Sequence, residues 1–173
     1  MYRDLKPENI GFDVRGNAKI FDFGLVKELL PKASVGNGLY IATGLTGSRR
    51  YMAPEVLLCK HYGLSADVYS FSILSWEVIA LKIPFEFYGC EEHANIIIKG
   101  EKRPNIDINW PYLTKEIIKG GWANDPLTRP DFCRICEMLQ GEIISWNEDK
   151  SGSSMVLNRS TQLMDQSNSS RRN

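Results

Sequence analysis

Four polar residues near the amino end, Asp4, Lys6, Asn9 and Asp22, carry side chains suited to phosphate and metal chemistry. The two carboxylates and the amide offer oxygen atoms, the ligands that Mg²⁺ prefers, and the ammonium group offers a positive charge for a phosphate. A carboxylate can also orient a hydroxyl group and accept its proton. Taken one at a time, each residue fits an ordinary polar turn equally well. The chemistry therefore depends on a fold that brings the four side chains together.

These residues belong to longer motifs that follow one another in a definite order. Tyr-Arg-Asp-Leu-Lys-Pro-Glu-Asn spans 2–9, Asp-Phe-Gly spans 22–24 and Ala-Pro-Glu spans 53–55. The combination resembles the signature of the eukaryotic protein kinase family, and the resemblance extends over about residues 1–141. One three-residue motif occurs by chance in many proteins, whereas three motifs in this order and at these spacings are specific.

The resemblance implies a role for each of the four residues. In-line phosphoryl transfer needs a carboxylate that orients the acceptor hydroxyl, and Asp4 matches the family's carboxylate. Lys6 would contact the transferred phosphate, while Asn9 and Asp22 would bind Mg²⁺. The expected cofactors are therefore ATP and Mg²⁺, and the expected reaction moves the γ-phosphate of ATP to a hydroxyl of a protein substrate.

Other residues match motif positions that face the substrate or regulate the enzyme. Ser48, in a Gly-Ser pair, resembles the substrate-binding residue whose hydroxyl meets the catalytic carboxylate and lysine. Arg3 resembles the arginine that receives a phosphate from the activation loop, and Thr43 and Thr46 are candidate phosphorylation sites on that loop. A plain turn or surface role is the alternative for these hydroxyl residues.

Three further charged residues resemble the family's structural supports. Glu55 and Arg129 match a buried ion pair that fixes the end of the activation segment, and Asp67 matches a carboxylate that accepts backbone N–H groups of the catalytic loop. The surroundings of Trp122 are similar to the tyrosine-kinase-like branch. Lys6, however, is the residue that serine/threonine kinases place after the catalytic carboxylate, so we expect serine or threonine as the acceptor.

The pattern of apolar residues predicts the elements that position these motifs. Ile10–Val14 and Ala18–Asp22 are two short runs around a Gly-Asn turn, which predicts a β-hairpin. Residues 24–51 are rich in Gly, Ser and Thr without sustained periodicity, which predicts a long functional loop. Ser65 is placed to cap a helix that runs to about Leu81, and its apolar character predicts burial on nearly every side.

Shorter helices are predicted at 91–99, 114–119 and 130–140, each followed by a glycine. The expected fold is mainly α and resembles the C-terminal lobe of a kinase, a helical bundle with a short β-hairpin at the catalytic cleft and with the N-terminal lobe absent. Residues 1–145 would form this partial kinase domain. The serine-rich remainder, 146–173, is expected to be a disordered polar tail.

Charge and cysteine content limit the expected binding partners and the expected cellular location. Lysine and arginine number 21 and aspartate and glutamate 21, so neither nucleic acid nor a membrane is expected as a partner. Four cysteines without a signal peptide favour a reducing, cytoplasmic location. Cys133 and Cys136 have the spacing of half a zinc site, but without a second pair they are predicted to be ordinary helix residues.

The nucleotide-binding motifs of the family are not found in the 173 residues. Gly36-Asn37-Gly38 does not replace the glycine-rich loop, because a third glycine would have to stand at Ile41. We therefore expect that the chain begins inside the domain and is inactive alone. Two functions stay open: a serine/threonine kinase seen as its C-terminal lobe, or a non-catalytic fragment whose helical surface binds a partner that covers the exposed lobe surface.

Overall fold

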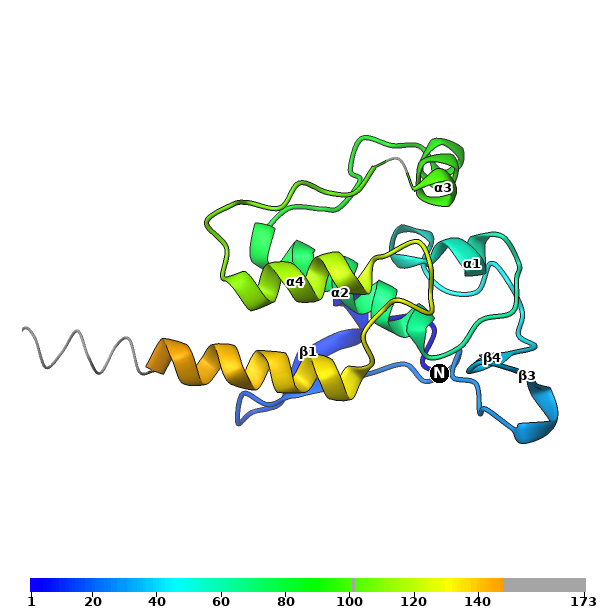
Figure 1. The fold of residues 1–173 in the computed structure, drawn as a ribbon, viewed down its shortest axis with the longest axis horizontal. Coiled ribbons are helices and arrows are strands. Elements are labelled where there is room, and N and C mark those ends of the chain that lie inside the picture. The colour runs from blue at the N-terminus through cyan, green and yellow to red at the C-terminus, as the bar shows by residue number, and fades with distance from the viewer. Residues whose placement is uncertain (101, 148–173) are drawn as a thin grey trace, which may run out of the picture.

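The structure of the chain is a computed structural model that describes residues 1–100 and 102–147 (Figure 1). It is mostly helical, with two small antiparallel sheets in its first half. In chain order the elements are η1 Pro7–Asn9, β1 Ile10–Phe12, β2 Ala18–Ile20, η2 Pro31–Ala33, β3 Ser34–Gly36, β4 Leu39–Tyr40, η3 Arg49–Tyr51, α1 Pro54–Leu57, α2 Ser65–Ala80, α3 Cys90–Lys99, α4 Tyr112–Gly121 and a last helix over 132–147.

The predicted hairpin after the first motif is confirmed, with strands shorter than expected. β1 and β2 are antiparallel, and Ile10 lies opposite Ile20. Asp13 closes the turn, because one carboxylate oxygen accepts the backbone N–H of both Arg15 and Asn17 at 2.9 Å. Gly16 has a φ of 80°, which favours glycine. The hairpin follows η1 directly and so begins next to the first motif, at 2–9.

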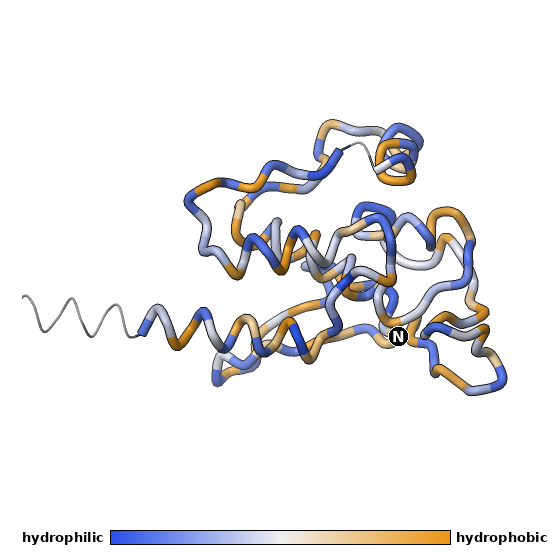
Figure 2. Tube along the Cα trace, viewed as in Figure 1, coloured by the Kyte–Doolittle hydropathy of each residue, from blue (hydrophilic) through white to orange (hydrophobic). Residues whose placement is uncertain are grey.

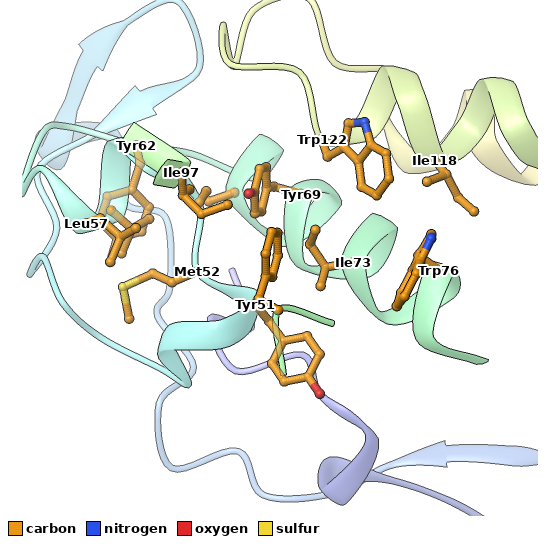
Figure 3. Close-up of a cluster of buried hydrophobic side chains, with 14 residues drawn as sticks. Tyr51, Met52, Leu57, Tyr62, Tyr69, Ile73, Trp76, Ile97, Ile118 and Trp122 are labelled. Atoms are coloured by element: carbon orange, nitrogen blue, oxygen red, sulfur yellow. The ribbon is translucent and has the colours of Figure 1, made fainter. Parts of the chain in front are cut away.

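Helix α2 forms the centre of the hydrophobic core, as its apolar sequence predicts. Tyr69, Ile73 and Trp76 point into a cluster that also receives residues from η3, α1, α3 and α4 (Figure 3). Burial ends before the last turn, where Val78 is 61% and Leu81 87% exposed, so the prediction of burial on nearly every side is wrong there. Leu81 closes the helix in the left-handed conformation, with a φ of 52°.

The predicted cap of α2 is also wrong. Leu64 occupies the N-cap position, and Ser65 is the first helical residue, without a side-chain capping bond among the described residues. Polar groups of the first turn instead accept hydrogen bonds from other parts of the chain. The Ser65 carbonyl accepts a hydrogen bond from Arg129, and Asp67 receives two bonds from the amino-terminal segment.

Helix α4 and the 132–147 helix run past glycines that were expected to stop them. α4 includes Gly121, whose missing side chain allows close contact with Ser72 on α2. The last helix continues through Gly141, and the next residue, Glu142, accepts the backbone N–H of Leu113 in the first turn of α4 at 3.0 Å. Figure 2 shows hydrophobic and hydrophilic stretches alternating along this helix.

The same helix bears on the predicted tail. Residues 146 and 147 are helical, so a disordered tail from 146 is wrong for these two positions. The rest of that prediction, 148–173, lies outside the described residues. Helix α3 ends as predicted, because Gly100 adopts the left-handed conformation with a φ of 69°.

Residues 24–51, expected to lack regular structure, contain a second hairpin. β3 and β4 pair across Asn37 and Gly38, whose φ angles of 52° and 70° are typical of a type I′ turn. Both strands are only two or three residues long, which explains why the sequence shows no alternation of apolar and polar residues there. Within the described part of the chain, no helix is both long and apolar enough to cross a bilayer.

Candidate active site

The segment that carries the first motif is fixed to the central helix. The carboxylate of Asp67 on α2 accepts the backbone N–H of Tyr2 at 2.8 Å and of Arg3 at 2.7 Å. Asp67 is buried, and both bonds are partly buried. Arg3 itself has a φ of 73°, a conformation that needs such support. The predicted contact of Asp67 is thus present, and it sets the position of Asp4.

Asp4 lies at the centre of a cluster that includes three other sequence-predicted residues. Its Oδ2 is 2.9 Å from the Lys6 ammonium, and its Oδ1 accepts the Ser48 backbone N–H at 2.7 Å. The Lys6 ammonium also donates to the Ser48 hydroxyl at 2.9 Å. Asn9 donates its amide N–H groups to the main-chain and side-chain oxygens of Asp4, at 2.8 and 3.0 Å. The loop of Ser48 and the first motif therefore meet as predicted.

This approach of the two loops depends on Gly47. It has a φ of 101°, and a side chain there would collide with the carbonyl oxygen of Arg3. Glycine is consequently the residue that allows Ser48 to reach Asp4.

Hydrogen bonding keeps Asp4 and Lys6 charged. Burial by itself would raise the pKa of Asp4, but the hydrogen bonds from Lys6 and Ser48 outweigh it and lower the pKa below the usual value. The pKa of Lys6 is raised, chiefly by its hydrogen bond with Asp4. At neutral pH the site therefore presents a carboxylate beside an ammonium, which suits orientation of a hydroxyl more than strong proton abstraction.

Asp22 lies on the same side of the molecule as this cluster. The backbone N–H of Phe21 donates to the carbonyl of Asn9 at 2.8 Å, which places the next residue beside the first motif. The charge of Asp22 is among those that raise the pKa of Lys6, after the stronger effect of Asp4. One Asp22 carboxylate oxygen accepts the Gly24 N–H at 3.0 Å.

Tyr2 supports the segment around Asp22. Its ring contacts that of Phe23 edge to face, with centroids 5.9 Å apart, and its hydroxyl donates to the carbonyl of Phe21. Burial chiefly raises the pKa of Tyr2, and the charges of Asp4 and Asp22 add to the effect. Tyr2 thus links the first two motifs.

The donor set of Asn9 and Asp22 fits a hard cation with few protein ligands. No group of three or more His, Cys, Asp or Glu residues suitable for a metal occurs within residues 1–100 and 102–147. Because the amide nitrogen of Asn9 is bonded to Asp4, its carbonyl oxygen is the atom left for a cation. Mg²⁺ commonly takes one or two protein oxygens and completes its shell with phosphate and water.

Comparison with known proteins decides the family. The protein kinase domain family matches residues 1–165. The chain belongs to the protein kinase family. Among curated relatives, the serine/threonine-protein kinase STY46 of Arabidopsis thaliana is 35% identical over 160 residues, which cover 91% of this chain and 27% of that protein. STY17 of the same plant is 32% identical over 150 residues, with coverages of 87% and 25%.

A third relative comes from a slime mould. The dual specificity protein kinase shkC of Dictyostelium discoideum is 33% identical over 145 residues, which cover 83% of this chain and 28% of that protein. The chain therefore spans about a quarter of the length of these kinases.

The arginine of the kinase motif contacts one of the two candidate phosphorylation sites. Arg3 donates to the hydroxyl of Thr43 at 3.0 Å and to the carbonyl of Leu25 at 2.5 Å. Thr43 is exposed, whereas the hydroxyl of Thr46 is turned toward the main chain and donates within its own turn. Tyr62, which sequence reasoning missed, donates its hydroxyl to the carbonyl of Thr43 at 2.6 Å. The two threonine hydroxyls also bond each other at 3.0 Å, and that of Thr43 is the one placed against Arg3.

The predicted ion pair of the kinase fold is present and buried. The Arg129 guanidinium donates to the two carboxylate oxygens of Glu55 at 2.7 and 2.9 Å. The Arg129 side chain is 0% exposed and that of Glu55 5%. Arg129 also donates to the carbonyls of Ser65 and Ala123, each at 2.9 Å. The pair therefore joins α1, α2 and the segment before the last helix.

The residues around Trp122 also form one connected unit in this kinase fold. Arg103 donates to the carbonyl of Trp122 at 3.1 Å and to the side chain of Asn124 at 2.5 Å.

The four cysteines, at 59, 90, 133 and 136, are free thiols on exposed residues.

Proposed function

We propose that the chain is the C-terminal lobe of a serine/threonine kinase of the tyrosine-kinase-like branch, formed by residues 1–145. The observation that carries the proposal is the contact of Asp4 with Lys6, Asn9 and Ser48 in one cluster. A hydroxyl group placed there would meet a carboxylate, an ammonium and a substrate-facing loop together. Among known chemistries this set matches phosphoryl transfer.

In the proposed reaction, Asp4 orients the acceptor hydroxyl and takes its proton as the oxygen bonds to the γ-phosphorus. The bond from that phosphorus to the β-phosphate oxygen breaks, and ADP leaves. Lys6 sits where its charge can stabilise the moving phosphoryl group, and ATP with Mg²⁺ supplies that group and neutralises the polyphosphate. Asn9 and Asp22 would hold the cation through oxygen atoms.

The proposal also covers the acceptor residue, the cellular location and the partners. Lys6 and the printed names of the plant relatives support serine or threonine as acceptor. Equal numbers of basic and acidic residues and four unpaired thiols support a cytoplasmic enzyme that acts on protein, without nucleic acid or membrane as partner.

A chimera tests the enzymatic function. The segment of STY46 that precedes the matched region is joined to residue 1 of this chain, and transfer of phosphate from ATP to a generic serine substrate is measured with Mg²⁺. We expect activity from the chimera and none from the 173-residue chain, because the chain has no glycine-rich loop. A soluble, folded chimera without activity would contradict the kinase proposal. Robust activity of the chain alone would contradict the C-lobe proposal.

A non-catalytic scaffold is the second candidate, and exposed apolar surface favours it. Phe87 is 91% and Leu81 87% exposed, and both follow the buried part of α2. Such surface favours association with a partner or with copies of the chain. Sedimentation at micromolar concentration should therefore show self-association of the isolated chain. A monodisperse monomer that melts cooperatively would contradict this expectation.

Phosphorylation of Thr43 is expected to activate the kinase. The phosphate would pair with Arg3, which already contacts the Thr43 hydroxyl, and charge-assisted hydrogen bonds are worth about 1.5–3 kcal/mol each. Mass spectrometry of an active chimera should find phosphate on Thr43 and little on Thr46, and Thr43→Ala should lower kcat by about tenfold. An active preparation with neither threonine modified would rule the mechanism out.

A further inference from the structure

A small cleft between η3 and the start of α3 has features of an anion-binding site. It measures about 60 Å³. Its lining residues come from three segments: Arg49, Arg50, Phe85, Tyr88, Cys90 and His93. No carboxylate occurs among these described lining residues, and Glu91 and Glu92 on the first turn of α3 are exposed outside it.

His93 supplies an unused polar atom in this cleft. The residue is 5% exposed, and its Nε2 is buried without a hydrogen-bond partner among the residues that the structure describes. The ring is held edge to face against Phe85, with centroids 4.6 Å apart. Burial lowers the pKa of His93 to about 4, with Arg50 contributing, so the ring is neutral at physiological pH. Buried polar atoms are nearly always paired, so this nitrogen has a hydrogen-bonding capacity that no described residue uses.

Two positive groups line the same cleft. Arg49 and Arg50 are consecutive residues of η3, and Arg50 also donates to the carbonyl of Pro84. The ten-residue helix α3 begins at Cys90, and no described side chain caps its amino end, so its first N–H groups are available. Two guanidinium groups and a helix amino end together favour an anion.

The cleft lies next to the proposed acceptor position. Ser48 contacts both Asp4 and Lys6, and Arg49 is the next residue, about 3.8 Å away between Cα atoms. An extended peptide advances about 3.3 Å per residue. A substrate with its hydroxyl at Asp4 can therefore reach the cleft with a side chain one to three residues away.

We propose that this cleft binds the carboxylate or phosphate of a substrate side chain close to the acceptor serine or threonine, so that the kinase acts on acidic sequences. The inference rests on the proposed function. Arg49 and Arg50 supply charge-assisted hydrogen bonds, and His93, which lines the same cleft, supplies a neutral partner. Aspartate, glutamate and phosphoserine share this chemistry.

Peptide kinetics with the chimera test the preference. Peptides with one serine acceptor carry Glu, phosphoserine, Ala or Lys at each position from −3 to +3. We expect one position at which Glu or phosphoserine raises kcat/KM about tenfold over Ala, and at which Lys lowers it. A gain with phosphoserine alone identifies a primed substrate, and a gain with both identifies an acidic one. Equal rates at all positions would overturn the inference.

Reversing the charge of one lining arginine tests whether the preference for acidic peptides comes from the cleft. Arg49 is exposed, so Arg49→Glu should fold, and it should favour Lys over Glu at the selected position. Arg134→Glu, an exposed arginine on the last helix, should leave the ratio of Glu to Ala peptides unchanged. A ratio that survives Arg49→Glu would place the recognition elsewhere and overturn the proposal.

A binding measurement keeps this inference separate from catalysis. In the Asp4→Asn chimera, NMR shifts of the His93 ring are followed during titration with a phosphoserine peptide and with its unphosphorylated form. We expect saturable shifts with the phosphopeptide even if no chimera transfers phosphate, in which case only the proposed function fails. An unshifted His93 ring overturns the anion site.

Discussion

Replacing Asp4 with asparagine in the chimera is expected to lower kcat for peptide phosphorylation by about 10²–10⁴-fold. The change keeps the size of the side chain but removes the group that takes the hydroxyl proton and the partner of Lys6. The KM for the peptide should change little, because Asp4 acts on the acceptor hydroxyl and the peptide is held by other contacts.

The matched control is Asp107→Asn. Asp107 is exposed, and its carboxylate accepts a local bond from the backbone N–H of Asn109 at 2.8 Å, so the same chemical change there should leave kcat within about twofold. A chimera with Asp4→Asn that keeps more than half of the parent kcat would show that Asp4 is not the catalytic carboxylate.

Removing one partner of the buried ion pair should give the largest loss of stability. Glu55→Ala leaves the Arg129 guanidinium buried with its charge unpaired, and such changes typically lower the free energy of unfolding by about 3–5 kcal/mol. Urea unfolding of the chimera, with parent and variant measured side by side, gives this quantity. The contacts of Arg129 with the carbonyls of Ser65, Ala123 and Asn124 would stay but cannot neutralise its charge.

The comparison is Glu137→Ala in the exposed pair with Arg134. Those side chains are 65% and 64% exposed and 3.0 Å apart, and exposed pairs contribute about 0–1 kcal/mol. If Glu55→Ala cost no more than Glu137→Ala, the pair would not fix the activation segment to the helices.

The sequence predicted those elements whose patterns are long or whose ends carry a strong local signal. The first hairpin was expected from alternation around a Gly-Asn turn, and α3 from its closing glycine, Gly100. The second hairpin was missed because its strands are very short, although Asn37-Gly38 is itself a typical hairpin turn. Gly120 and Gly141 were expected to end their helices, yet both helices continue past them, and the neighbouring Gly121 and Glu142 contact other elements of the fold.

The candidate site was predictable to the extent that its residues lie in motifs. Ser48 and Asp67 were expected to meet the first motif, and both do. Tyr62 and His93 were not singled out, because an isolated Tyr or His outside any motif gives no functional signal in the sequence. Only the fold shows that the Tyr62 hydroxyl bonds to Thr43 and that His93 lines the same cleft as Arg50.

A crystal structure of the chimera with Mg²⁺ and a non-hydrolysable ATP analogue would show whether Asp4, Asn9 and Asp22 share one site. We expect a Mg²⁺ ion about 2.0–2.1 Å from the carbonyl oxygen of Asn9 and from an Asp22 carboxylate oxygen, with Asp4 facing the γ-phosphate. A cation bound elsewhere, with the carboxylates of Asp4 and Asp22 facing separate surfaces, would contradict it.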